Sequence, residues 1–146
     1  YFFFFLKEKP NKDDHCIDGL QMLKKTPKIA TLSYARPGDY GRSEEINQSL
    51  DDAKKLTQLI EKHTNQKIEN SCVLIDQAIK NKCNILIAPN GIVGNTIFRT
   101  LVLLNSWPSF GAITFGIDDI YIDTSRDQSR EGYLRSLELA YKLAKL

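Results

Sequence analysis

The sequence predicts an α/β fold with three layers, a mostly parallel sheet with helices on both faces. Short apolar runs alternate along the chain with segments in which apolar residues recur every three or four positions. That alternation is the pattern of strands connected by helices, which builds a parallel sheet. The run Ile85–Ala88 contains no polar residue. Such a run indicates a strand buried on both faces, so we expect it at the centre of the sheet.

Composition excludes several classes of function. The chain has 146 residues, of which 42% are apolar and 26% charged, as in ordinary globular proteins. The formal charge of +2 is small and basic residues are interleaved with acidic ones, so we expect no nucleic-acid partner. No run approaches the roughly 20 apolar residues that cross a bilayer, so we expect no membrane partner. Three cysteines without a CxxC pair favour a reducing, cytoplasmic location.

Two strands and a helix are expected at the start of the chain. Residues 1–6 are almost all aromatic, which favours the pleated, buried surface of a strand. The run is too short for the apolar region of a signal peptide. Asp13 or Asp14 can cap a helix that ends before Pro27. The apolar run 29–34 predicts the next strand.

The loop 35–43 has two readings. It contains two arginines, and as a lip over a binding cleft it would bring Arg36 or Arg42 to an anionic group. It also contains Gly38 and Gly41, so it can equally be a solvated turn that needs glycines for backbone reasons.

A long helix should follow Ser43, which is a good N-cap residue. Two glutamates stand in its first turn, and Lys62 and His63 stand in its last turn, an order that suits the helix dipole. Its apolar residues form one stripe, which indicates a helix that covers a sheet face. They are Ile46, Leu50, Ala53, Leu56, Leu59 and Ile60.

The second half of the chain repeats the alternation. Residues 67–69 predict a very short strand, and 71–80 predict a helix. Pro89 ends the central strand, and Gly94 and Asn95 open the next helical pattern. The remaining predicted elements are strands at 112–117 and 120–122 and a helix at 128–145 with Leu134, Leu137, Tyr141 and Ala144 on one stripe.

Several kinds of catalytic site are disfavoured by spacing. His15 and His63 have no cysteine or carboxylate at metal-ligand spacing, so we expect no metal site. No serine, histidine and aspartate combine in a recognisable triad. Gly91 and Gly94 lack the spacing of a dinucleotide-binding GxGxxG loop.

Five short stretches, taken in order, resemble a known family. They are the strand 28–34 with its Leu-Ser pair, Pro89-Asn90 and Gly94-Asn95 after a hydrophobic strand, Gly116, and Asp123-Thr124-Ser125-Arg126. These stretches are similar to motifs of the phosphate acetyl/butyryltransferase family, and within it to the methanogenesis marker proteins of methanogenic archaea. The resemblance implies the three-layer fold of phosphate acetyltransferase and isocitrate dehydrogenase.

The resemblance also implies an activity, the transfer of an acyl group between phosphate and coenzyme A. Coenzyme A would then be a substrate, and no metal is implied. In the family the Ser of Asp-x-Ser-Arg stabilises the transition state and the Arg binds an anion, so Ser125 and Arg126 would be the catalytic residues. The other residues expected around an acyl phosphate or CoA-type ligand are Ser33, Arg36, Asn90, Gly94, Asn95 and Asp123.

One position departs from the family and leaves the activity open. The aspartate proposed as the base, seven residues after the Ser, is replaced by Gly132. The neighbouring Glu131 would be turned about 100° away on a helix. The alternative is a non-catalytic partner or regulatory protein of methyl-transfer metabolism that retains the fold.

Family members are about twice as long and have two α/β domains around a cleft. By resemblance, residues 1–116 form the second of these domains. Residues 117–146 form the return strand and C-terminal helix that would complete the first. We therefore expect a partner, either a missing N-terminal half or a second subunit, and a homodimer.

Overall fold

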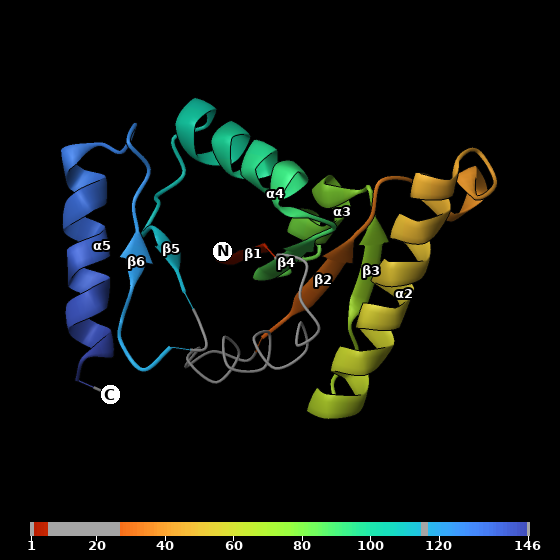
Figure 1. Ribbon diagram of the computed structural model, residues 1–146, viewed down its shortest axis with the longest axis horizontal. Coiled ribbons are helices and arrows are strands. Elements are labelled where there is room, and N and C mark those ends of the chain that lie inside the picture. The colour runs from red at the N-terminus through yellow and green to blue at the C-terminus, as the bar shows by residue number, and fades with distance from the viewer. Residues whose placement is uncertain (1, 6–26, 115–116, 146) are drawn as a thin grey trace. The chain divides into compact units, whose positions relative to one another are not determined.

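The computed structural model describes residues 2–5, 27–114 and 117–145 (Figure 1). The chain forms two compact units. Unit 1 runs from Tyr1 to Phe98 and unit 2 from Arg99 to Leu146.

Some predictions fall outside the described residues. The helix expected after Asp13 or Asp14 is one of them, with His15 and Cys16, and Gly116 is another. The division into a domain 1–116 and a return segment stays a prediction. Among the helices that the structure describes, none is long and apolar enough to cross a membrane.

Unit 1 is built on one parallel sheet. Its strands are β1 (Phe2–Phe5), β2 (Ile29–Leu32), β3 (Glu69–Cys72) and β4 (Ile85–Ala88), and its helices are α2 (Glu44–Thr64), α3 (Ile75–Lys80) and α4 (Gly91–Phe98). The strand order is β1-β4-β2-β3, and every neighbouring pair is parallel. The predicted α/β class with a parallel sheet is confirmed.

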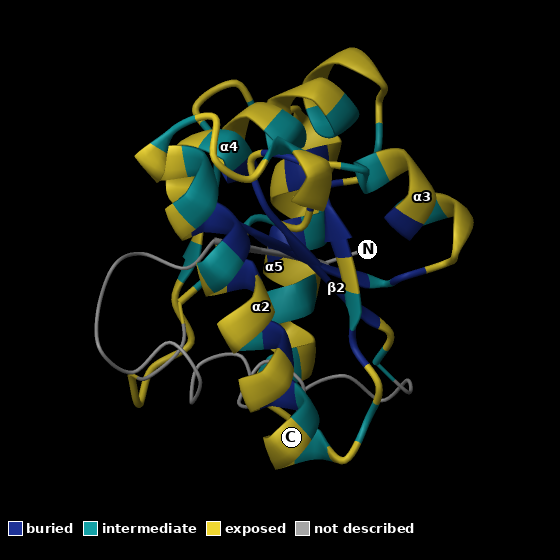
Figure 2. Cartoon of the chain, turned by 90° about the vertical axis from the view of Figure 1, so that its right-hand side faces the viewer, coloured by how far each residue is buried: buried dark blue, intermediate teal, exposed yellow. Residues whose placement is uncertain are grey.

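The central strand β4 pairs with β1 on one side and β2 on the other, and all four of its residues are buried. Its side chains alternate between the two faces of the sheet. Ile85 and Ile87 belong to a core cluster with Ile60 of α2, whereas Leu86 belongs to a second cluster with Ala78 of α3. Helices therefore cover both faces, as the apolar run predicted, and buried residues follow the strands in Figure 2.

Helix α2 matches its prediction closely. The Ser43 hydroxyl accepts a hydrogen bond from the Ile46 amide at 3.3 Å, which caps the first turn. At the other end Asn65 takes a left-handed conformation with φ 53°, which stops the helix. The buried stripe includes Leu50, Ala53 and Ile60, so this helix covers one face of the sheet.

The boundary between β3 and α3 was predicted wrongly. The strand begins at Glu69, not Lys67, and the helix begins at Ile75, not Ser71. Pairing with β2 defines the strand Glu69–Cys72, and the Ser33 amide donates to the Cys72 carbonyl at 3.0 Å. β3 is an edge strand of mostly polar residues, so it carries no apolar alternation that a sequence pattern could reveal.

Unit 2 contains a short antiparallel pair, β5 (Ala112–Ile113) and β6 (Ile122–Asp123), followed by α5 (Arg130–Leu143). A π-helical turn, η2 (Arg99–Leu104), precedes them. The described parts of both strands are shorter than predicted. Helix α5 begins two residues later than predicted, because the Ser129 hydroxyl caps it by accepting from the Gly132 amide at 3.1 Å.

Gly111 is held where unit 2 has no room for a side chain. Its φ is +85°, a region that other residues rarely adopt. A Cβ here would lie 2.5 Å from Ile122 Cγ2 and 2.9 Å from the Asp123 carbonyl oxygen. The segment before α5 is also tied to that helix, because Arg135 Nε donates to the Ser109 carbonyl at 3.0 Å.

A hydrogen-bond network connects the segments at the amino-terminal ends of β3 and β4 in unit 1, an end of the sheet that we call its amino edge. The Glu69 carboxylate accepts from the Ser71 hydroxyl at 2.7 Å, the Asn81 amide at 3.0 Å and the Cys83 thiol at 3.4 Å. Burial raises the pKa of Glu69, but these hydrogen bonds and the Lys28 charge outweigh it, so the pKa is lowered overall. Burial also raises the pKa of the Cys83 thiol to about 11. Cys83 and Cys72 are free and buried, as predicted.

We expect Glu69→Gln to destabilise the protein by about 1–3 kcal/mol at pH 7, the scale of a lost charged hydrogen bond. Because the folded pKa is lowered, this stability is present above the unfolded pKa of about 4.3 and is lost as pH falls through the folded value. Urea unfolding at pH 7 and pH 3 should show the difference between wild type and variant shrinking in acid. Asp118→Asn, which changes an exposed carboxylate, is the control, and an equal effect at both pH values would contradict the network.

We expect Gly111→Ala to cost about 1–3 kcal/mol, because alanine must adopt an unfavourable φ and its Cβ would also meet the Ile122 side chain and the Asp123 carbonyl oxygen. Gly38→Ala is the matched control, since a Cβ at Gly38 meets no atom within 4 Å. Thermal unfolding followed by circular dichroism measures both. Equal melting temperatures for the two variants would show that the Gly111 conformation is not required.

Candidate functional site

The carboxyl ends of β2 and β4 form a crevice at one edge of the sheet. The two strands are parallel neighbours. From β2 the chain continues through α2 to β3, whereas from β4 it continues into α4, which contacts β4 and β1. Adjacent strands whose connections leave in opposite directions mark the place where α/β proteins bind ligands. The loops that follow β2 and β4 therefore leave the sheet at the same end of its strands, but none of residues 35–43 lines the groove described below.

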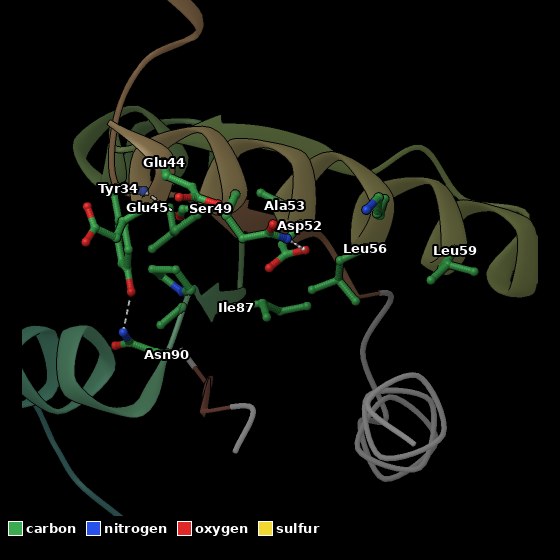
Figure 3. Close-up of a pocket in the computed structure, with 15 residues that line it drawn as sticks. Tyr34, Glu44, Glu45, Ser49, Asp52, Ala53, Leu56, Leu59, Ile87 and Asn90 are labelled. Atoms are coloured by element: carbon green, nitrogen blue, oxygen red, sulfur yellow. Dashed lines mark hydrogen bonds between the residues drawn. The ribbon is translucent and has the colours of Figure 1, made fainter. Parts of the chain in front are cut away.

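A groove of about 590 Å³ opens at this crevice and continues along α2 (Figure 3). Its floor is apolar, and its rim carries hydroxyl, amide and charged side chains. The apolar lining residues, here called the floor, are Leu32, Ala53, Leu56, Leu59, Ile87, Ala88 and Pro89, and the polar ones, here called the rim, are Tyr34, Glu44, Glu45, Gln48, Ser49, Asp52, Lys55 and Asn90.

One hydrogen bond spans the crevice. The Asn90 side-chain amide donates to the Tyr34 hydroxyl, as the dashed line in Figure 3 shows. The Tyr34 backbone is itself fixed to α2, because its amide donates to the Ser49 hydroxyl at 3.0 Å. The rim therefore joins the end of β2, the end of β4 and the second turn of α2.

Asn90 has a second role, as the N-cap of α4. Its side-chain oxygen accepts from the Val93 amide at 2.9 Å. Helix α4 thus begins at Gly91, and the prediction that Gly94 and Asn95 open it was wrong. Asn directly before a helical pattern is a known capping signal and could have placed this start.

The other residues predicted in this region are placed differently. Gly94 is buried within α4, and Asn95 is exposed. Ser33 is 4% exposed, and its hydroxyl donates to the Ala35 carbonyl at 3.0 Å. The structure brings Ser33 and Asn90 to the same sheet edge, but only Asn90 lines the groove.

Hydrogen bonds and an ion pair connect residues within the loop after β2 and join this loop to α2. The Asp39 carboxylate accepts from the Arg36 amide at 3.0 Å and pairs with Arg42 at 2.9 Å. Gly41 donates its amide to Asn47 at 2.6 Å. The Tyr40 hydroxyl donates to Asp51, whose charge raises the pKa of Tyr40.

These contacts make the loop a structured turn. Arg42 is already paired, and neither it nor Arg36 lines the groove. The prediction that Arg36 binds a ligand is not tested by this arrangement and stays a prediction.

The charges around the groove disfavour a polyanion. Three carboxylates, Glu44, Glu45 and Asp52, stand against one ammonium group, Lys55. Gln48 donates to Asp52 at 2.8 Å, which holds that carboxylate on the rim. The summed potential favours a neutral or cationic ligand with an apolar part.

The predicted residues Asp123, Ser125 and Arg126 lie in unit 2. Asp123 ends β6 and is exposed, and the Ser125 hydroxyl accepts from the Asp127 amide at 3.3 Å. Arg126 is exposed. Ser125 and Arg126 lie in the turn between β6, which ends at Asp123, and α5, which begins at Arg130.

Gly132 makes room for Gln128. A Cβ at Gly132 would lie 2.3 Å from the Gln128 Cδ, so the glutamine side chain is folded over the first turn of α5.

Within residues 27–114 and 117–145, no group of three or more His, Cys, Asp or Glu side chains could hold a metal ion.

Comparison with curated proteins gives relatives in methanogens. An uncharacterized methyltransferase of Methanopyrus kandleri is 32% identical over 127 residues, which is 85% of this chain and 49% of the relative. An uncharacterized methyltransferase of Methanocaldococcus jannaschii is 34% identical over 112 residues, 76% and 45% of the two chains. The putative methyltransferase mtx subunit X of Methanosarcina barkeri is 38% identical over 101 residues, 68% and 36% of the two chains.

The chain therefore spans about half the length of the first two relatives, and less of the third. No family model matches the chain. No solved structure matches it.

These relatives correct the predicted family. They are named methyltransferases, not phosphate acetyltransferases, so the assignment to the phosphate acetyl/butyryltransferase family and the acyltransferase activity were wrong. The methanogen context fits the organisms found. The relatives favour the alternative reading, a partner protein of methyl transfer, and coenzyme A as a ligand stays a prediction.

We expect Asn90→Ser to keep the cap of α4 but lose the bond to Tyr34, at a cost of about 0.5–1.5 kcal/mol. Asn90→Ala should cost roughly 1 kcal/mol more, because it also removes the cap. In a Tyr34→Phe background, Asn90→Ser should cost almost nothing further. Urea unfolding of the four proteins and wild type measures these differences, and equal stabilities of the Ser and Ala variants would contradict the capping role.

Proposed function

We propose that this chain belongs to a non-catalytic partner or regulatory component of a methyl-transfer system. The observation that carries the proposal is the 38% identity to a protein named as a methyltransferase subunit, together with two relatives named as methyltransferases. The proposal extends to the three-layer α/β arrangement of unit 1, which we expect the longer relatives to retain.

We propose further that the groove at the ends of β2 and β4 holds the ligand of this component. The groove lies where the connections after β2 and β4 leave in opposite directions, and this position supports the proposal. Its combination of an apolar floor with a polar rim supports it as well. Backbone amides hydrogen-bond to the Ser49 hydroxyl and the Asn90 side chain, and Asn90 in turn holds the Tyr34 hydroxyl, so polar groups that can orient a ligand are fixed in place. The excess of carboxylates favours a ligand with positive charge.

A cationic methyl donor provides the test. S-adenosylmethionine carries a positive sulfonium group, and S-adenosylhomocysteine is nearly the same molecule without that charge and methyl group. Calorimetric titration should show S-adenosylmethionine binding about three- to tenfold more tightly, the scale of one solvent-exposed ion pair. Coenzyme A is the anionic comparison and should bind most weakly.

The double variant Glu45→Gln, Asp52→Asn should remove this preference, and Asp118→Asn should not. Radiolabelled S-adenosylmethionine should keep its methyl group in the presence of the chain. Transfer of the label to an added thiol acceptor, with the chain as the only protein present, would show an enzyme in place of a partner. If neither adenosyl compound binds, the proposal that this groove holds a methyl donor is refuted.

A further inference from the structure

Helix α5 has one buried face and one exposed apolar face. Gly132 and Ser136 are buried on one side, against the segment that contains Ser109 and Gly111. Leu134, Leu137 and Tyr141 lie on the opposite side of the helix and are 57%, 67% and 61% exposed. A single helix that covers its own unit needs only the first face, so the second requires an explanation.

The exposed face has the spacing of a helix-pairing seam. Leu134, Leu137, Tyr141 and Ala144 follow one another at intervals of three, four and three residues. This is the a and d pattern by which one helix packs along another. Ala144 is also exposed and continues the face to the end of α5.

We propose that a second copy of this chain covers this face, with the two α5 helices antiparallel about a two-fold axis. In that register Leu134 packs against the partner's Ala144, and Leu137 packs against the partner's Tyr141. The same contacts recur on the other side of the axis, as a self-complementary interface requires. One pair thus combines a leucine with the small side chain of Ala144, and the other combines a leucine with the flat ring of Tyr141.

The charges beside the seam fit the antiparallel register. Glu131 lies opposite the partner's Lys145, and the symmetry creates this pair twice. Lys145 Nζ stands 4.2 Å from the centre of the Tyr141 ring, so its ammonium group is at the edge of the seam. Glu138 would meet its own copy at the axis, but Lys142 already pairs with it at 2.6 Å. In a parallel pair Glu131 and Lys145 would lie at opposite ends of the interface, about 14 residues apart along the helices, and could not pair.

The size of the face sets the strength of the dimer. A pair of helices with about three turns each lies at the low end of specific interface areas. We therefore expect a weak dimer with a dissociation constant of about 10–100 μM, in exchange with the monomer.

Sedimentation equilibrium of the whole chain from about 5 to 500 μM tests the proposal, a range that brackets the expected constant. Wild type should pass from monomer to dimer. Leu137→Glu should remain monomeric throughout, because two desolvated carboxylates would replace two packed leucines. Leu104→Glu changes an equally apolar and more exposed leucine outside α5, and it should dimerise as wild type does.

Charge reversal tests the register. Glu131→Lys and Lys145→Glu should each weaken the dimer about three- to tenfold at low salt, since each disrupts two surface ion pairs. The double variant should restore the wild-type constant. Within one helix the two residues are about 20 Å apart, so this restoration cannot arise inside one chain.

A monomeric wild type at all concentrations would overturn the proposal, and the face would then belong to another part of the chain or to a different protein. A dimer that Leu137→Glu leaves intact would overturn it as well. A dimer that both single charge variants leave unchanged would reject the antiparallel register. None of these outcomes depends on whether the groove of unit 1 binds a methyl donor.

Discussion

The burial of β4 on both faces is the constraint on which unit 1 depends. Ile85–Ala88 offers no polar side chain that could face water, so helices must cover both sides of this strand. In this sheet the connections that follow β2 and β4 also leave in opposite directions. The crevice between β2 and β4 follows from that arrangement, and it exists before any side chain of the rim is considered.

The two edges of the sheet are built for different purposes. At the amino edge, the Glu69 carboxylate gathers donors from three segments and leaves little capacity for a ligand. At the carboxyl edge, Tyr34 and Asn90 meet across the crevice but remain partly accessible. The same sheet thus has one edge that is closed by its own hydrogen bonds and one edge where a ligand can replace or extend them.

Sequence patterns predicted the elements that burial determines. The apolar stripe of α2 and the run of β4 were both correct, because periodicity reports which side of an element avoids water. The start of α4, the span of β3 and the start of α5 were wrong. Each depends on a single polar contact or on pairing with a distant strand, through Asn90, Cys72 and Ser129 respectively.

The candidate site was predicted only in part, for the same reason. Asn90 was found because it follows a recognisable strand, and it lines the groove. Tyr34 and Ser49 were missed, because their importance arises from contacts between segments that are separate in the sequence. No local pattern distinguishes Ser49 from other serines on a helix.

The error in the predicted family has a structural explanation. Pro89, Asn90 and Gly94 resembled a motif of that family, but in this chain they respectively end a strand, cap a helix and lie buried within that helix. Any strand followed at once by a helix needs residues of these types, whatever reaction the protein serves. A motif whose members all have such local roles reports the geometry of a strand-to-helix turn, and the chemistry must then be inferred from the side chains that the turn leaves facing the crevice.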